Sequence, residues 1–210
     1  MELGKYIVIE GHDGTGKSTQ VDIVRQRLLD NYGIESEKLE EPGGTPIGDE
    51  IRTILKNGEL ERDPKTNLLL FTSARCELWK HMSAVLKIGR WVVVARNFYS
   101  SLAYQGYGEG LDLGLIEETT KTFTDEQYMN PNIPLILSLD DEVERAKRIK
   151  LRGELEKPDA FESKGDEFQS RVRNGYLEIA KSRNVPIISA NQSIEKMADE
   201  IWTHIEHAIK

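Results

Sequence analysis

The feature that most constrains this chain is a glycine-rich segment at residues 11–18, with the sequence GHDGTGKS. It follows the apolar run 6–9, precedes a helical pattern, and matches the motif G-x-x-x-x-G-K-[ST]. In this setting the glycines let backbone N–H groups surround phosphate oxygens, and the dipole of the following helix favours their negative charge. The segment therefore predicts a strand–loop–helix unit that binds a phosphorylated ligand.

The motif also assigns chemical roles within the loop. Lys17 is expected to reach the β- and γ-phosphates of a nucleotide, and the Ser18 hydroxyl is expected to bind Mg²⁺. Asp13 lies where a carboxylate would repel phosphate, so we interpret it as facing a second substrate, where it accepts from a sugar hydroxyl or a metal-bound water. His12 is interpreted as a solvated loop histidine. The residues expected to contact the nucleotide are Gly11, Gly14, Thr15, Gly16, Lys17, Ser18 and Thr19.

Short apolar runs along the chain predict a parallel sheet. Most of them do not alternate with polar residues, which is typical of strands buried on both faces. They are 6–9, 91–94, 133–139 and 185–189, and the more polar 34–39 is a candidate edge strand. Helical patterns separate these runs, at 17–32, 47–55, 64–86, 141–151, 166–181 and 193–208. The alternation predicts right-handed crossovers and a layered α/β fold.

Composition and charge narrow the class of protein. The 210 residues are 38% hydrophobic and 30% charged, as in one globular domain with a core of ordinary size. The net charge of −8 argues against a nucleic-acid partner. No run approaches the ~20 apolar residues of a membrane span, and the start leads directly into a strand without a signal peptide, so we expect a cytoplasmic protein. Cys76 is the single cysteine, which excludes an internal disulfide, and we expect it to be buried.

Further motifs follow the glycine-rich loop in a set order. They are Glu41-Pro42-Gly43-Gly44-Thr45, Phe71-Thr72-Ser73-Ala74-Arg75, Arg96, the run 100–106 (SSLAYQG), Arg152-Gly153-Glu154-Leu155 and Phe161-Glu162. In order and approximate spacing the chain resembles the thymidylate kinases of the nucleoside-monophosphate kinase group, nearly from end to end. The resemblance implies a three-layer α/β/α phosphate-loop kinase fold with a five-stranded parallel sheet. It also implies one domain over 1–210 with a mobile lid at about 145–165.

The activity implied by the resemblance is transfer of the γ-phosphate of ATP to dTMP with Mg²⁺, usually in a homodimer. Phe71 and Arg75 are four residues apart and share a helix face. In the family the aromatic ring stacks on thymine and the arginine donates to its exocyclic O4. Ser101 matches a position that bonds the pyrimidine edge. Tyr104 matches a ring near the sugar that disfavours a 2′-hydroxyl, and Gln105 is placed to contact base or sugar.

The resemblance also implies which cations hold the phosphates. Arg52 matches an arginine that binds the monophosphate, and Arg96 matches one that bridges the donor and acceptor phosphates. Arg148 and Arg152 match lid positions that touch adenine and phosphate. Lys17, Arg96 and Arg152 are therefore expected to neutralise the transferring phosphoryl group.

The chain departs from the usual family motifs at several positions. The family normally has Asp-Arg after the third strand, where this chain has alanine at position 95, so a carboxylate that helps to organise Mg²⁺ is missing. Asp13 and Asp140 are candidate replacements. Ala160 stands where the family often has a lid arginine, and Glu40 also replaces an arginine.

These departures leave two alternatives open. One is a kinase of the same fold for another acceptor, such as dUMP or a nucleoside. The other is a degenerate nucleotide-binding protein with a regulatory role, in which binding is retained and turnover is poor. The retained lysine and arginines argue against the second alternative.

Overall fold

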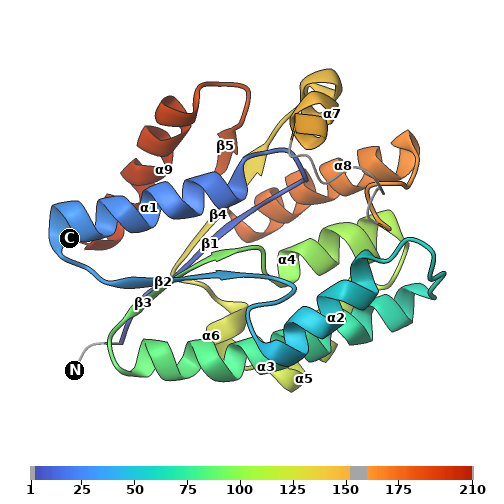
Figure 1. Ribbon diagram of the computed structural model, residues 1–210, viewed down its shortest axis with the longest axis horizontal. Helices are drawn as coiled ribbons and strands as arrows, with labels where there is room; N and C mark the ends of the chain where they lie inside the picture. Colours follow the sequence, from blue (N-terminus) through green and yellow to red (C-terminus); the bar gives the residue numbers. More distant parts are fainter. Residues whose placement is uncertain (1–2, 152–159, 210) are drawn as a thin grey trace.

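The computed structural model describes residues 3–151 and 160–209. Within them, one sheet has the strand order β2-β3-β1-β4-β5, and every neighbouring pair is parallel (Figure 1). The strands are β1 (Tyr6–Gly11), β2 (Ser36–Glu40), β3 (Trp91–Ala95), β4 (Ile133–Ser138) and β5 (Ile187–Ser189). The polar segment predicted as an edge strand lies at an edge of the sheet as β2.

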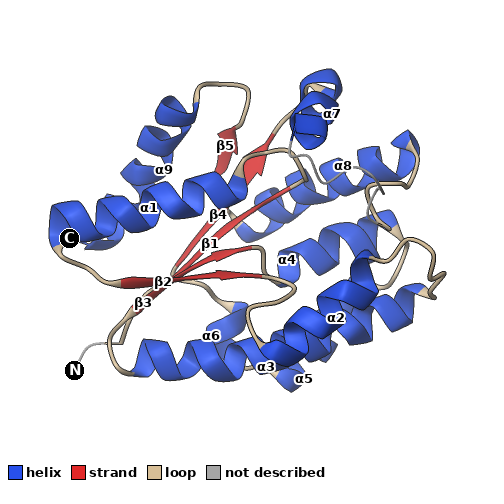
Figure 2. Cartoon of the chain, viewed as in Figure 1, coloured by secondary structure: helices blue, strands red, loops and turns tan. Residues whose placement is uncertain are grey.

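Helices cover both faces of this sheet (Figure 2). They are α1 (Lys17–Tyr32), α2 (Pro46–Lys56), α3 (Pro64–Lys87), α4 (Phe98–Ser101), the π-helix η1 (Leu102–Gly108), α5 (Leu113–Phe123), α6 (Glu126–Met129), α7 (Glu142–Leu151), α8 (Asp166–Arg183) and α9 (Ile194–Ile209). Ile7 and Ile9 of β1 join the core under α1 and α9, whereas Tyr6 and Val8 join the core under α3, α5 and α8. The predicted three-layer α/β/α fold with five parallel strands is confirmed.

Local sequence signals account for several helix ends. α1 ends at Gly33, whose φ of 64° is the left-handed conformation that glycine adopts at helix C-termini. Thr45 and Asp63 cap the starts of α2 and α3, each followed by a proline at the first helical position. These signals fix the residues at which α2 and α3 begin.

The region between β3 and β4 contains helices that the sequence patterns did not predict. It contains α4, η1, α5 and α6, none of which the apolar spacing predicted. α4 and α6 have four residues each, too few to establish a period, and η1 does not follow the 3.6-residue repeat. For α5 a signal was present, because Asp112 caps it by accepting from the Leu115 amide.

The predictions for Cys76 and for the segment 153–165 have different outcomes. Cys76 is half-buried, so the expectation of a buried thiol was wrong; it continues the exposed stripe of Leu69 and Ser73 along α3. Most of the segment predicted as a mobile loop, 153–165, lies outside the described residues, and its described part carries a buried phenylalanine, Phe161. In the described ranges, no helix combines the length and apolar character that crossing a membrane requires.

Candidate active site

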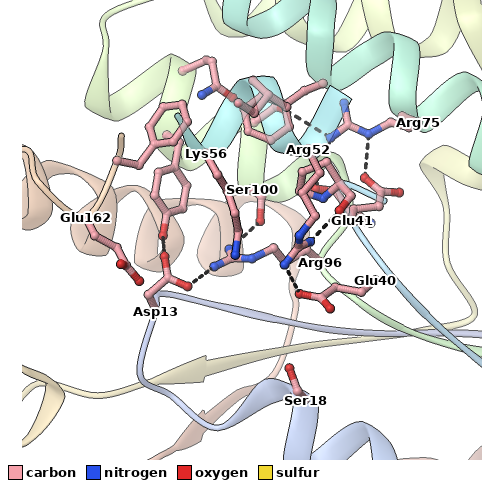
Figure 3. Close-up of a pocket in the computed structure, with 18 of the residues that line it drawn as sticks. Asp13, Ser18, Glu40, Glu41, Arg52, Lys56, Arg75, Arg96, Ser100 and Glu162 are labelled. Carbon is pink, nitrogen blue, oxygen red and sulfur yellow. Dashed lines mark hydrogen bonds and ion pairs between the residues drawn. The ribbon is translucent and has the colours of Figure 1, made fainter. Parts of the chain in front are cut away.

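A cavity of about 600 Å³ opens at the carboxyl ends of β1, β2 and β3 (Figure 3). Ligands of open α/β sheets bind at this edge, because loops from neighbouring strands converge there. The phosphate loop supplies one wall, and side chains from α2, α3, η1 and the Phe161–Glu162 segment supply the others. Of the predicted site residues, the cavity brings together Asp13, Ser18, Thr19, Arg52, Phe71, Arg75, Arg96, Ser101, Tyr104 and Gln105.

The phosphate loop, residues 11–18, has the backbone form that its glycines predict. Gly11, Gly14 and Gly16 have φ values of 138°, 90° and 88°, which side chains with a Cβ rarely adopt. A Cβ on Gly11 would also lie 2.3 Å from the Leu137 carbonyl oxygen of β4. Substitution of Gly11 is therefore excluded by both backbone conformation and space.

Side chains of the loop converge on one carbonyl group. The Lys17 ammonium and the Thr15 hydroxyl each donate to the His12 carbonyl oxygen over 2.8 Å. Ser18 and Thr19 lie at the start of α1, where they are exposed and line the cavity. The loop thus carries a lysine, a hydroxyl and a helix N-terminus at the edge of the cavity.

Arg96 occupies the centre of the site, in an unusual backbone conformation. Its φ is 74°, a left-handed value that is uncommon for residues other than glycine. Its guanidinium forms an ion pair with Asp13 and donates to Ser100 Oγ at 3.1 Å, to the Gly11 carbonyl oxygen at 3.3 Å and to Tyr176 Oη at 3.3 Å. Figure 3 shows this guanidinium lying between the phosphate loop and Ser100.

Asp13 is held by two partners on the cavity wall. Its second carboxylate oxygen accepts from the Tyr104 hydroxyl over 2.8 Å. Burial acts to raise the pKa of Asp13, but the positive charges of Arg96 and Lys17 outweigh it and hold that pKa well below its ordinary value. Asp13 is therefore a carboxylate throughout the working pH range, and it lines the cavity.

His12 does not behave as predicted. It was expected to be a solvated loop residue, but only 4% of it is exposed, and its Nε2 lies 2.7 Å from Gln169 Oε1 of α8. Burial lowers its pKa to about 4, with Arg145 adding to the effect. The prediction failed because the residue that covers His12 is remote in sequence, so local composition carried no signal.

At the opposite end of the cavity, Arg75 of α3 is 1% exposed. Its Nε donates to Glu41 Oε2 over 2.9 Å, and its second terminal nitrogen donates to Ser101 Oγ over 3.2 Å. Two buried donors here, Arg75 Nη1 and Gln105 Nε2, have no hydrogen-bond partner among the described residues. Together with the half-buried Phe71 ring, Arg75 and Gln105 line one part of the cavity, here called the slot.

Arg52 of α2 lies between these two ends. It donates to the Pro42 carbonyl oxygen at 2.5 Å and to Glu40 Oε1 at 2.9 Å, and it is half-buried (Figure 3). The Gly44 amide donates to Asp49 of α2 over 3.0 Å, which holds the loop after β2 against this helix. Glu40, which replaces a family arginine, therefore serves as the partner of Arg52.

Of the two predicted lid arginines, Arg148 is the one that the structure describes. Arg148 of α7 donates to Glu144 Oε1 at 2.9 Å and to the Ala190 carbonyl oxygen at 3.0 Å, outside the lining of the cavity. Arg152 lies outside the described residues. The role of Arg148 at the nucleotide stays a prediction.

Two functional candidates escaped the sequence reasoning. Glu10 ends the apolar part of β1, is completely buried, and accepts from the amides of Asn97 and Ser100, the Ser100 hydroxyl and the Tyr176 hydroxyl at 2.8–3.0 Å. A carboxylate at the end of an apolar strand was the signal that could have revealed it. Tyr176 lies in the middle of α8 and had no such signal. Together they support Ser100 and Arg96.

The alanine at the end of β3 remains a true departure from the family motif. Ala95 is 3% exposed and packs in the apolar core under α1, so no carboxylate projects from that strand end. Asp140 accepts from Ser138 Oγ over 3.3 Å and does not line the cavity. In the described part of the chain, no group of three or more His, Cys, Asp or Glu residues is arranged to hold a metal ion.

The sheet order, the phosphate loop and the cavity beside it define a phosphate-loop nucleotide-binding fold. Comparison with known proteins narrows this class further: a model of the family described as "Thymidylate kinase" matches residues 9–201. The chain belongs to the thymidylate kinase family.

Individual relatives match over nearly the whole chain. A thymidylate kinase of Prochlorococcus marinus (strain NATL2A) is 37% identical over 99% of this chain and 98% of its own. One from Prosthecochloris aestuarii is 39% identical over 90% of this chain and 86% of its own. The crystal structure of thymidylate kinase from Ehrlichia chaffeensis superposes with a TM-score of 0.77 at 27% identity, covering 97% of this chain and 99% of that one. The resemblance inferred from the motifs is confirmed.

Proposed function

We propose that this chain transfers the γ-phosphate of ATP to dTMP, producing dTDP and ADP. The observation that carries the choice of acceptor is the pair of unsatisfied buried donors, Arg75 Nη1 and Gln105 Nε2, beside Phe71. Buried N–H groups without acceptors are costly, so a carbonyl oxygen of a bound ligand, reached by a small shift of these side chains, would satisfy them. Thymine supplies carbonyl groups on a flat ring that packs well against an aromatic side chain.

Arg75 also selects against cytosine. Arg75 is an obligate donor, because a guanidinium has no acceptor atom. Cytosine has an amino group where thymine has O4, so two donors would face each other and neither would be satisfied. Uracil keeps the carbonyl and lacks only a methyl group, so dUMP is the competitor that the donors reject least.

The sugar and phosphates of dTMP extend from this slot toward the phosphate loop. Tyr104 and Asp13 lie on that path, and their hydrogen bond places a carboxylate beside the expected sugar. Arg52 and Arg96 line the same side of the cavity and supply cations for the acceptor phosphate. This arrangement fits the roles that the family resemblance implies for these residues.

On the donor side, the backbone amides of residues 11–18, together with Lys17, would hold the ATP phosphates. The residues present fit Mg²⁺ through the exposed Ser18 hydroxyl, with nucleotide phosphates and water as the other oxygen ligands, because Mg²⁺ commonly keeps several waters. Bound there, the ion would neutralise phosphate charge. Ala95 means that this chain uses no carboxylate from β3 for the purpose.

Catalysis in this arrangement rests on positioning and charge. The acceptor phosphate is already ionised at neutral pH, so no general base is required. Lys17 and Arg96 neutralise the transferring group, with Arg152 as a third cation in the proposed lid, and Asp13 holds Arg96 in place. The exclusion of water from the closed site would direct phosphate to the nucleotide.

Several features of the whole protein complete the proposal. We expect one kinase domain over 1–210 with a lid at about 145–165, in a cytoplasmic homodimer that acts on nucleotides and has no nucleic-acid or membrane partner. Light scattering at micromolar concentration tests the dimer, and a monomeric mass would contradict it.

The test of the activity is an ADP-release assay with Mg-ATP and a panel of acceptors: dTMP, dUMP, dCMP, dGMP, dAMP and thymidine. Fastest turnover with dTMP supports the proposal. Faster turnover with another acceptor contradicts the assignment of the base slot. Binding of ATP without turnover of any acceptor would favour the regulatory alternative. Membership of the thymidylate kinase family does not favour that alternative.

A further inference from the structure

A buried hydrogen bond joins the phosphate loop to α8. His12 Nε2 lies 2.7 Å from Gln169 Oε1, and the two residues are 4% and 5% exposed. Neither of these two side chains lines the cavity. The activity proposed above assigns no role to this pair.

The direction of this hydrogen bond follows from the other contacts of Gln169. Its Nε2 donates to the Phe161 carbonyl oxygen at 2.8 Å and to the Lys164 carbonyl oxygen at 3.1 Å. With both amide hydrogens directed at these carbonyls, Gln169 Oε1 must be the atom that faces His12. His12 therefore donates from Nε2–H, and its lowered pKa of about 4 keeps the ring neutral.

The carbonyls that Gln169 holds belong to a wall of the cavity. The Phe161 ring lies 5.8 Å from the Phe71 ring and 5.9 Å from the Tyr104 ring, between centroids. Lys164 forms an ion pair with the buried Glu109 at the end of η1. The segment 160–164 is thereby fixed against the part of the cavity assigned to the acceptor base.

We infer that His12 and Gln169 are positioning residues that couple the donor site to the acceptor site. The donor phosphates are expected on the loop that contains His12, and the acceptor base is expected under Phe161, which Gln169 holds. A shift of the loop on nucleotide binding is transmitted through this bond to the acceptor wall. This inference rests on the proposed function, because it takes ATP and dTMP as the two ligands.

Coupling of this kind is reciprocal, which makes it measurable at equilibrium. Each nucleotide is expected to raise the affinity for the other by about fivefold or more in the unaltered protein. The measurement is calorimetric titration of dTMP with and without a non-hydrolysable ATP analogue and Mg²⁺. The reverse titration must give the same factor.

The variants His12→Leu and Gln169→Met remove the bond while keeping side chains of similar size. We expect the coupling factor to fall to about one in both variants. A merely structural role would lower the melting temperature and leave the factor unchanged, because the factor is a ratio for folded protein. The double variant His12→Leu/Gln169→Met pairs two apolar side chains; it serves where a single variant folds poorly, and the same loss is expected.

Gln20→Met is the matched control. Gln20 is also a fully buried glutamine, and its amide donates to the Ile194 carbonyl oxygen over 3.0 Å, on the other side of the sheet. Its coupling factor should equal that of the unaltered protein. An unaltered protein without coupling, or variants that keep it, would overturn the inference. Absence of dTMP turnover by the unaltered protein in the ADP-release assay contradicts the proposed function instead, so the two failures are distinct.

Discussion

At the scale of single residues, the site depends on how Arg96 is held. Its φ of 74° directs the guanidinium toward the phosphate loop, where Asp13, Ser100 and Tyr176 contact it. The buried Glu10 accepts from both Ser100 Oγ and Tyr176 Oη. One carboxylate below the site thus orients two hydroxyl groups that contact the central arginine.

The variant Tyr176→Phe tests this support. It removes one hydroxyl and leaves the ring, so Arg96 loses a polar partner without loss of packing. Because a hydrogen bond to a charged group contributes about 2 kcal/mol, we expect kcat to fall by about tenfold or more, with a small change in KM for dTMP. Steady-state kinetics measure both constants.

Tyr99→Phe is the control for this variant. Tyr99 is another buried tyrosine of the same core, and its hydroxyl interacts with Arg183, away from Arg96. Its kcat should stay close to that of the unaltered protein. Equal losses in both variants would mean that the Tyr176 hydroxyl acts through core stability and does not orient Arg96.

The variant Arg75→Gln tests the selection of the base. Glutamine both donates and accepts, so it tolerates the cytosine amino group. We expect the ratio of kcat/KM for dTMP to that for dCMP to fall by about tenfold or more. The variant removes the positive charge beside Glu41. Because burial raises the pKa of Glu41, this carboxyl can take a proton when Arg75 is absent. An unchanged ratio would show that other residues select the base.

The variant Ala95→Asp restores the acid that the family motif normally contains. If Ser18, the nucleotide phosphates and water complete the magnesium ligands, the gain in kcat should stay below about tenfold. Turnover measured across a range of Mg²⁺ concentrations checks this. A large gain would favour the degenerate, regulatory alternative.

The position of a residue could be predicted from the sequence where a motif fixed the local geometry. The loop glycines have the backbone conformation that the motif predicts, and Arg75 and Arg96 line the cavity, since each is positioned by its own element. Their roles at the substrates stay predictions. His12 and Glu10 were misjudged or missed because their partners, Gln169 and Tyr176, come from α8, far along the chain. Pairing across such a distance leaves no trace in local composition.

At the scale of elements, α8 is the helix that organises the site. It supplies Gln169 and Tyr176 and packs closely on η1, the π-helix that carries Tyr104 and Gln105. Gly108 and Gly175 permit this approach: a Cβ on Gly108 would lie 2.6 Å from a Phe168 ring carbon, and one on Gly175 would lie 2.8 Å from Tyr107 Cβ. Close helix contact therefore depends on glycine at both positions.

The variant Gly108→Ala should consequently destabilise the protein. Forcing a methyl group against Phe168 and Val172 is overpacking, which typically costs about 1–3 kcal/mol. Chemical denaturation measures the loss. Gly165→Ala is the control for space, because a Cβ there meets no atom within 4 Å and its φ is negative. Gly165 is the N-cap of α8, where alanine is less favourable than glycine, so a smaller loss of below about 1 kcal/mol is expected. A similar loss in both variants would contradict the account of this helix contact.

Elements were predictable where the pattern was long. The buried strands and α1, α2, α3, α8 and α9 followed from apolar spacing and caps. The segment 98–129 did not, because its π-helix and four-residue helices are stabilised by packing under α3 and α8. The residues expected to contact the base lie partly in this segment, and the family motif, not periodicity, predicted them.

At the scale of the whole molecule, His12 predicts a pH dependence of stability. Its pKa is about 4 in the folded protein against an ordinary 6.5, so protonation favours the unfolded chain. The contribution is fully present above pH 6.5 and is lost as the pH falls toward 4. As the pH falls from 7 to 4.5, protonation of this residue should lower the free energy of unfolding by about 2 kcal/mol.

Denaturation of the unaltered protein and of His12→Leu at both pH values isolates this contribution. The variant has no imidazole, so its stability should fall less over the same interval. Identical pH dependence of the two proteins would mean that the folded protein accommodates the charged ring, contrary to its burial.

The most direct test of the central claim is a competition between dTMP and dCMP at equal concentration, with Mg-ATP and a catalytic amount of protein. Separation of the products by chromatography gives the rates of dTDP and dCDP formation in one reaction. The account predicts that dTDP dominates, because the guanidinium of Arg75 only donates and therefore requires a carbonyl oxygen. Formation of dCDP at a similar rate, or release of ADP without dTDP, would contradict it.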